Sequence, residues 1–356
     1  MRAERWRVGV LGLGWVARQV HLPYLVSSAE AEIVAAFDPD RACAQAVREL
    51  FGIPTLDSME QLFETPSDVV FVCSPPATHG ALARMALECG RHVVCEKPLA
   101  MTAEEAEAIA GLAWRRGLKL FCCLTNRYRP DVQRLAETTA AGAIGEPRYV
   151  RAEWLRSRGI PNTSGALDHG VLWDLGTHLV DLVLWVTGWG SPTHVCATSL
   201  TLAGDVRAER ATWHAAASRP VSGPLPDDTS LLELQFGRGQ AAHVEASWCA
   251  HVPQDRTELL VLGTTGALHL QTVFGWSPHR DEVAEPALAV SDPDRSRWHA
   301  LLTTQDRERS EYRRQLDVFF TQLATGDLDR AALQVSVETT RTMARAQAAL
   351  LRCEEA

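Results

Sequence analysis

Residues 7–17 read Arg-Val-Gly-Val-Leu-Gly-Leu-Gly-Trp-Val-Ala, an apolar strand pattern that runs into a Gly-x-Gly-x-x-Ala turn at the start of a helix. In such a turn Gly12 permits a tight bend and Gly14 lets the backbone approach a pyrophosphate. The N–H groups at the helix start also attract the negative charge of that group. This spacing is weak evidence alone, but its position between a strand and a helix predicts a dinucleotide-binding turn.

A second signal follows at the end of the next apolar run, Phe37-Asp38. A carboxylate at this spacing can accept hydrogen bonds from the ribose hydroxyls of adenosine. The charge of Asp38 would also repel a 2′-phosphate, and Arg41 is the only cation nearby, so the sequence favours NAD over NADP. In this part of the chain, the expected cofactor contacts are Gly12, Gly14, Trp15, Val16, Asp38 and Arg41.

The composition limits the class of ligand. The chain has 356 residues, of which 46% are hydrophobic, and a formal charge of -9 with no basic block, which argues against nucleic acid or an anionic membrane as partner. No apolar stretch is long enough to span a membrane, and the first residues lack a signal peptide, so we expect a cytoplasmic protein that binds a small molecule. The nine cysteines show no metal-ligand spacing, so we expect reduced thiols and no metal site.

Periodicity predicts two domains. Up to residue 125, short apolar runs alternate with helical spacing, which is typical of a doubly wound α/β domain; residues 126–356 predict an α+β domain with an open, mostly antiparallel sheet. Two closing helices, Ser310 to Thr325 and Ala331 to Arg352, can pack back on the first domain. The other expected elements of the second domain are helices Pro130 to Ala141 and Leu172 to Val186, strands Pro147 to Arg156, His194 to Leu202, Asp228 to Phe236, Gln240 to Trp248, Glu258 to Leu262 and Ala267 to Gln271, and long loops Gly204 to Pro226 and Ser277 to Arg297.

Two strand ends carry candidate chemistry. We expect the fourth strand to end in Cys73-Ser74-Pro75 and the fifth in Cys95-Glu96-Lys97, and such carboxyl ends border the crevice where a nicotinamide would lie. Lys97 is one of two lysines in an arginine-rich chain, which indicates a need for an amine that arginine cannot replace in proton transfer. The expected contacts here are Ser74, Pro75, His79, Glu96 and Lys97.

The helix predicted over Leu172 to Val186 has two stripes. One is apolar, and about 100° away around the helix lie Asp174, His178, Asp181 and Trp185, so the helix should have two neighbours. Spacing i, i+4 places Asp174 beside His178. The pair alone is compatible with catalysis, with part of a metal site lacking further ligands, or with a hydrogen-bonded surface pair.

These motifs together resemble the Gfo/Idh/MocA family: the glycine turn, Glu96-Lys97-Pro98, Asn126-Arg127-Tyr128-Arg129-Pro130 and Asp174-x-Gly-x-His178. The resemblance covers nearly the whole chain. It implies a Rossmann domain, then an open-sheet domain that often mediates oligomerisation, so a homo-oligomer is expected, with NAD(P) in the cleft between the domains. It further implies that Lys97, Asp174 and His178 act on a sugar or cyclitol hydroxyl. Arg127 is expected to contact the cofactor and Tyr128 the substrate.

One segment departs from the family pattern. Where members often have a run of glycines, this chain has Asp168 and His169, which either reach the substrate or only alter a loop. The strand before that segment adds Trp154, Arg156 and Arg158 as candidate sugar contacts, because tryptophan stacks well on the apolar faces of sugars.

The sequence therefore predicts an NAD-dependent dehydrogenase that oxidises a secondary hydroxyl of a sugar, aminosugar or cyclitol, or catalyses the reverse reduction. His178 would be the general base, Asp174 would orient it, and Lys97 would hydrogen-bond the developing alkoxide. Two alternatives remain: an NAD-dependent glycosidase of the same family, and a regulator that binds NAD and sugar without turnover. The arginine-rich, acidic composition also suggests tailoring of aminoglycosides or other secondary-metabolite sugars.

Overall fold

The computed structural model describes residues 5–161, 169–203, 227–277, 287–292, 294, 296–302 and 310–354. The chain divides into two compact units. The first unit combines Met1–Leu124 with Tyr312–Thr340, and the second combines Thr125–Glu311 with Arg341–Ala356. The first unit is therefore discontinuous in sequence, and both units take part of the last helix.

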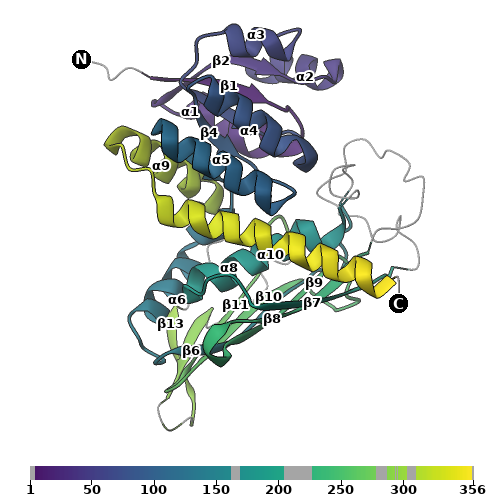
Figure 1. Ribbon diagram of the computed structural model, residues 1–356, viewed down its shortest axis with the longest axis vertical. Helices are drawn as coiled ribbons and strands as arrows, with labels where there is room; N and C mark the ends of the chain where they lie inside the picture. The colour runs from purple at the N-terminus through teal and green to yellow at the C-terminus, as the bar shows by residue number, and fades with distance from the viewer. Residues whose placement is uncertain are drawn as a thin grey trace. The chain divides into compact units, whose positions relative to one another are not determined.

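The first unit is built on a five-stranded parallel sheet of order β2-β1-β3-β4-β5 (Figure 1). Its strands are β1 (Trp6–Leu11), β2 (Ala31–Phe37), β3 (Val69–Val72), β4 (His92–Cys95) and β5 (Leu120–Cys122). The strands that lead to Cys73 and Cys95 are thus the third and fourth, and counting them as fourth and fifth was wrong. Between β2 and β3 the chain forms the helix α2 (Arg41–Phe51), an isolated parallel bridge, Ala36 to Thr55, and the helix α3 (Met59–Glu64).

Alternate residues of the central strands face opposite layers, because side chains in a strand alternate between the two faces of the sheet. Val70 and Val72 belong to a buried cluster with α4 (His79–Glu88), α5 (Ala103–Arg116) and the start of α10 (Arg330–Glu354). Phe71 points the other way, where its ring meets His21 and Phe319. The remaining helices of the unit are α1 (Leu22–Ser27), α2 (Arg41–Phe51), a 3-10 turn η2 (Pro76–Thr78) and α9 (Ser310–Thr325).

The second unit contains an eight-stranded sheet of order β13-β12-β11-β10-β6-β9-β8-β7. All neighbouring pairs are antiparallel except β6 and β9, which run parallel from Tyr149 opposite Ala241 to Leu155 opposite Ser247. The expected fold class is confirmed. The strands are β6 (Pro147–Leu155), β7 (His194–Leu200), β8 (Thr229–Gln235), β9 (Ala241–Ser247), β10 (Arg256–Gly263), β11 (Ala267–Thr272), β12 (Leu288–Ser291) and β13 (Trp298–Leu302).

The long loop expected over Ser277 to Arg297 is partly wrong, because β12 lies inside it and β13 follows directly. Four residues, Leu288 to Ser291, make a short strand whose alternation is hidden among flanking proline, aspartate and arginine residues. Loop Gly204 to Pro226 lies outside the described residues.

Helices α6 (Pro130–Ala140) and α8 (Thr177–Thr187) lie against the sheet of the second unit (Figure 1). The apolar stripe predicted for the longer helix is buried throughout: Leu172, Leu175, Leu179, Leu182 and Val186. Short turns η3 (Thr125–Tyr128), η4 (Leu172–Gly176) and η6 (Gly237–Gly239) complete the unit.

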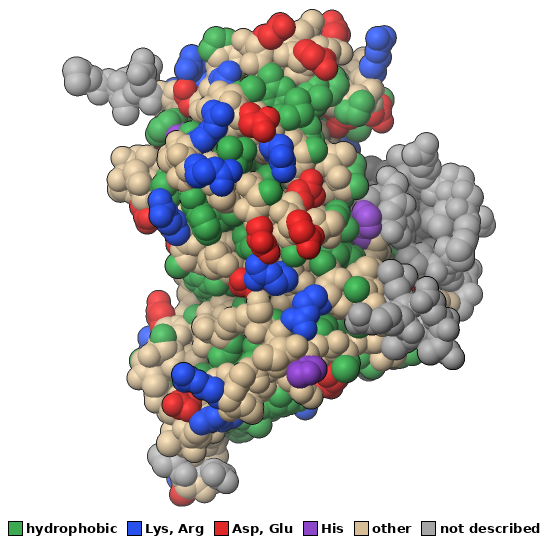
Figure 2. Space-filling view, viewed as in Figure 1, with side chains coloured by type: hydrophobic (Ala, Val, Ile, Leu, Met, Phe, Trp, Pro, Cys, Tyr) green, Lys and Arg blue, Asp and Glu red, His purple; other side chains and the backbone are tan. Residues whose placement is uncertain are grey.

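The surface carries mixed charge on the face drawn in Figure 2, where cations and carboxylates alternate over the described residues. This agrees with the absence of a basic block in the sequence. None of the helices in the described ranges is long and apolar enough to cross a membrane.

Candidate active site

The glycine turn that follows β1 has the geometry that a dinucleotide requires. Gly12 has a φ of +89°, and a Cβ there would lie 2.5 Å from the backbone nitrogen of Ser74, so only glycine fits. A Cβ at Gly14 would meet nothing within 4 Å, so the backbone borders open space. Trp15 and Val16 are the first helical residues after the turn and are half-buried. A pyrophosphate can therefore approach the backbone at Gly14 and the N–H groups of the helix start.

Asp38 lies beside this turn, at the end of β2. One of its carboxylate oxygens accepts the backbone N–H of Leu13 at 2.7 Å, and the other accepts that of Asp40 at 2.8 Å. Each oxygen retains a second lone pair for a ribose hydroxyl. Arg41, the first residue of α2, is exposed. The residues present thus fit both the pyrophosphate and the ribose of a dinucleotide.

His79 was expected to contact the cofactor, but its ring is buried and joins two loops. Its Nδ1 lies 2.7 Å from the carbonyl oxygen of Pro98, and its Nε2 lies 2.8 Å from that of Ser74. Burial lowers the pKa of His79, against the opposing effect of the two carbonyl oxygens. The loop after β3, with half-buried Ser74 and exposed Pro75, is thereby tied to the loop that carries Lys97.

Glu96 follows β4, and its carboxylate turns back toward the protein. Its Oε1 accepts a hydrogen bond from Nε2 of His21 at 2.7 Å, and its Oε2 accepts the backbone N–H of Lys97 at 3.2 Å. Burial raises the pKa of Glu96, but the hydrogen bond and charge of His21 and the charge of Lys97 together hold it below its usual value. The carboxylate is therefore ionised and bound on both oxygens.

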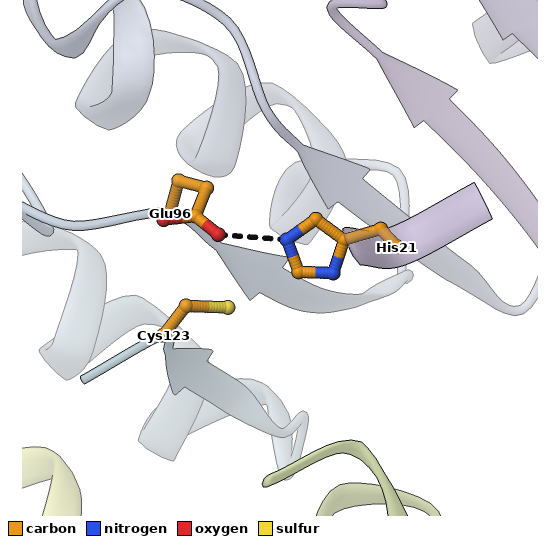
Figure 3. A group of neighbouring side chains, drawn as sticks. All are labelled: His21, Glu96 and Cys123. Atoms are coloured by element: carbon orange, nitrogen blue, oxygen red, sulfur yellow. Dashed lines mark hydrogen bonds and ion pairs between the residues drawn. The ribbon is translucent and has the colours of Figure 1, made fainter. Parts of the chain in front are cut away.

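Cys123 brings a thiol close to this pair, as Figure 3 shows. The three side chains His21, Glu96 and Cys123 include ligand types for zinc, and their ligand atoms lie within 4.8 Å of one another. Two ligands of one tetrahedral zinc, however, lie about 3.3 Å apart, given metal–ligand distances near 2 Å. The 2.7 Å between His21 and Glu96 is a hydrogen-bond length. In this structure His21 and Glu96 are therefore joined by a hydrogen bond.

In the second unit, the helix that carries Asp174 and His178 opens with a π-helical turn, Leu172–Gly176, before α8 begins. Such turns widen a helix locally and are frequent at functional sites. Asp174 lies within the turn and accepts the indole N–H of Trp248 at 2.9 Å, while the guanidinium of Arg156 lies 4.0 Å from the same oxygen. Asp174 is 21% exposed, so its carboxylate is held in place yet accessible.

His178 lies near Trp154, with ring centroids 5.8 Å apart. Trp154 is itself packed between the edge of Phe274 and the guanidinium of Arg156, 5.2 Å from its ring. The structure therefore groups four predicted residues, Trp154, Arg156, Asp174 and His178, in one unit. His169 is half-buried and Arg158 is exposed, while Asp168 lies outside the described residues.

Arg127 was expected at the cofactor, and its guanidinium is buried against α8. It donates to both carboxylate oxygens of Asp181 and lies over the ring of Trp185, 4.7 Å from the centroid. This contact supplies the second neighbour that the polar stripe of the helix predicted. Tyr128, the next residue, is half-buried at the end of η3.

Sequence reasoning missed His21 and Trp248. His21 comes from the π-helical turn Ala17–His21 after the glycine turn, and its ring is fully buried. Trp248 follows β9, 74 residues from its partner Asp174. Trp248 closes the strand predicted over Gln240 to Trp248, whereas nothing in the sequence around His21 pointed to a role.

Comparisons with known proteins decide the family. The pattern of the "Oxidoreductase family, NAD-binding Rossmann fold" matches residues 6–123, and that of the "GFO/IDH/MocA C-terminal domain" matches residues 132–269. The chain is 33% identical over 291 residues, 80% of each protein, to a candidate UDP-kanosamine synthase oxidoreductase subunit of Amycolatopsis mediterranei. The chain belongs to the Gfo/Idh/MocA family of oxidoreductases. The resemblance predicted from the motifs is thus confirmed.

Other relatives agree with this family. D-glucoside 3-dehydrogenase of Escherichia coli is 36% identical over 211 residues, 57% of this chain and 60% of the relative. UDP-N-acetylglucosamine 3-dehydrogenase of Acidithiobacillus ferrooxidans is 32% identical over 228 residues, 61% of this chain and 68% of the relative. The protein is an NAD(P)-binding oxidoreductase of a family that acts on CH–OH groups of sugars.

Two solved structures share the fold. GenD2 from gentamicin A biosynthesis, in complex with NAD, has a TM-score of 0.73 at 21% identity over 98% of this chain and 95% of that one. KijD10, a 3-ketoreductase from Actinomadura kijaniata with NADP, has a TM-score of 0.74 at 20% identity over 98% of both chains.

Proposed function

We propose that the protein is an NAD-dependent dehydrogenase that oxidises a secondary hydroxyl of a sugar or aminosugar at carbon 3, or reduces the corresponding ketone. The observation that carries the proposal is the presence of Lys97, Asp174 and His178 together in a chain related to two sugar 3-dehydrogenases. A regulator without turnover would not require all three groups. The relative named for UDP-kanosamine synthesis further favours an aminosugar or its precursor.

In the proposed reaction His178 takes the proton of the substrate hydroxyl as general base. Asp174, held by Trp248 and beside Arg156, orients the imidazole and offsets its positive charge. The Lys97 amine donates a hydrogen bond to the oxygen as its negative charge develops. NAD, held by the turn at Gly12 and Gly14 and by Asp38, would supply the hydride acceptor for this oxidation.

The substrate ring is expected to contact the aromatic and cationic groups around Asp174. Trp154 is 4% exposed, so it can offer only a small apolar surface to the substrate. Arg156 and Tyr128, which are half-buried, can donate hydrogen bonds to ring hydroxyls.

The preference for NAD rests on Asp38. Its two oxygens are already oriented by backbone N–H groups, and a 2′-phosphate beside this carboxylate would be an uncompensated like charge. Arg41 is the cation that could offset this repulsion, and its exposure leaves it in water.

The test is hydride transfer by the purified protein with glucosides, N-acetylglucosamine, UDP-sugars, inositols and aminoglycosides, followed by the absorbance of NADH. Borodeuteride reduction of the product, followed by NMR, identifies the oxidised carbon from the position of deuterium. We expect NADH with at least one sugar and label at carbon 3. Glycoside cleavage without net NADH would instead support the hydrolase, and label elsewhere would contradict the assigned position.

The base assignment has its own test in the same assay. If neutral His178 accepts the proton, oxidation should be faster when the imidazole is neutral than when it is protonated, so the rate should increase with pH. Single-turnover rates avoid limitation by product release. A flat single-turnover profile between about pH 5 and 8 would exclude His178 as the base.

A further inference from the structure

The segment that carries Lys97 is bound to its surroundings by the carboxylate of the preceding residue. Glu96 contacts the backbone N–H of Lys97 with one oxygen and Nε2 of His21 with the other. His21 cannot move away easily, because its ring is fully buried and packs edge-on against Phe71, 5.5 Å between centroids. The orientation of Glu96 is thus set from the helix that follows the glycine turn.

The charge on Glu96 has few groups to balance it. Among the described residues, the titratable groups around it include three histidine or lysine side chains, His21, His79 and Lys97, and three thiols, Cys73, Cys95 and Cys123. Burial raises the pKa of the Cys95 thiol well above its usual range. Burial raises the pKa of the Cys73 and Cys123 thiols well above their usual range, so neither supplies a charge. Burial lowers the pKa of His79, which favours its neutral form. The charges that face the carboxylate are therefore those of Lys97 and, when protonated, His21.

We propose that Glu96, oriented by His21, is the positioning residue of Lys97, fixing its backbone and keeping a negative charge beside its ammonium group. The carboxylate accepts a hydrogen bond from the backbone N–H of Lys97, and its negative charge attracts the ammonium group of the same residue. The kinetic part of this inference rests on the function proposed above, whereas the structural part does not.

Substitutions can separate the effect of the charge on Glu96 from the effect of its orientation by His21. Glu96→Gln keeps the length of the side chain and removes the charge. His21→Leu removes the N–H donor and keeps a buried apolar group beside Phe71, while His21→Gln can restore a donor of similar reach. An exposed carboxylate at the end of α4 provides the matched control Glu88→Gln.

The chain offers a direct readout, because Lys97 and Lys119 are its only lysines. Labelling lysine with ¹⁵N and with ¹³C at Cε gives two backbone signals and two side-chain signals, assigned with Lys119→Arg. Lys119 is the internal reference, since its N–H donates to Nδ1 of His92 and its ammonium to the carbonyl of Asp327, away from Glu96.

In Glu96→Gln we expect both the ¹³Cε signal and the amide signal of Lys97 to move, because the side chain loses its charge and the acceptor of the backbone hydrogen bond changes. His21→Leu should move the amide signal, and His21→Gln should return it toward the parent. The Lys119 signals should stay in place in every variant and confirm the fold. Glu88→Gln should match the parent throughout.

Lys97 signals of Glu96→Gln that coincide with the parent would overturn the proposal. If that variant fails to fold, identical Lys97 amide signals in His21→Leu and the parent would overturn it instead. Turnover of Glu96→Gln should fall by up to about 100-fold, as for a misplaced reacting group, with the KM for NAD near the parent value. Shifted NMR signals with unchanged turnover would support the positioning and contradict the role of Lys97 in the proposed reaction.

Discussion

The carboxyl edge of the five-stranded sheet and the opening of the long helix in the second unit both orient a group for the proposed chemistry, by different means. In the first unit, backbone atoms and buried histidines do so: His79 joins two carbonyl oxygens, and Glu96 binds a backbone N–H. In the second unit, Asp174 is oriented by the side chains of Trp248 and Arg156. The first arrangement depends on groups that titrate, and the second depends on groups that keep their charge state over the physiological range. The two parts should therefore respond differently to mutation and to pH.

The largest effect is expected for Lys97→Met. Loss of the amine should lower turnover by about two to four orders of magnitude, because the developing alkoxide loses its proposed hydrogen-bond donor. NAD binding should change little, since the turn at Gly12 and Gly14 is untouched. Steady-state kinetics and calorimetric titration with NAD measure the two quantities, with Lys119→Arg as control. Turnover within threefold of the parent would remove Lys97 from the mechanism.

Asp38→Ser should act on cofactor affinity rather than turnover. It should weaken NAD binding by about 1.5 to 3 kcal/mol, the usual contribution of hydrogen bonds to a charged group. The preference for NAD over NADP should shrink or invert, because serine does not repel the 2′-phosphate of NADP as the carboxylate of Asp38 does. Asp40→Ser is the matched control, since it removes a nearby charge while serine can still cap α2. Equal catalytic efficiency of the parent with NAD and NADP would contradict the role of Asp38 in selectivity.

Trp248→Phe tests the side-chain support of the second unit. The variant keeps an aromatic ring but removes the N–H that Asp174 accepts, so we expect turnover to fall about tenfold, the effect of about 1.4 kcal/mol, with NAD affinity unchanged. The exposed Trp298→Phe on β13 is the control. Weakened NAD binding in Trp248→Phe would show that the cofactor-binding residues of the first unit also depend on the contacts of Asp174 in the second.

The smallest effect concerns pH. Because burial lowers the pKa of His79 in the folded protein, the unfolded chain binds more protons once the pH falls below its own value of about 6.5. His79 therefore does not reduce the free energy of unfolding above that pH. It reduces this free energy increasingly as the pH falls toward the lower pKa of His79 in the folded protein. Urea unfolding between about pH 7.5 and 5 should show this decline, and His79→Gln should reduce it. An equal decline in parent and variant would assign it to other groups.

The two regions also differ in how much the sequence revealed. The turn at Gly12 and the carboxylate of Asp38 follow from local spacing, because one strand–turn–helix unit builds the site. Asp174 and His178 lie four residues apart and were found in the same way. Trp248 could not be found from local spacing. Its contact with Asp174 depends on the pairing of β9 with β6 and β8, which no local pattern specifies. His79 and Arg127 were assigned to the cofactor from position alone, and their partners, two carbonyl oxygens and Asp181, could not be foreseen from spacing.

The first unit is assembled from two segments that lie far apart in the sequence, and this affects its synthesis. Phe71 and Phe121 are synthesised 248 and 198 residues before Phe319, whose ring both contact in the finished unit. During that interval one face of the nascent parallel sheet lacks its covering helix, and such faces associate readily with other apolar surfaces. The dinucleotide turn is therefore synthesised long before the helix that completes its unit. We therefore expect chaperone dependence to be relieved only when α9 has been translated.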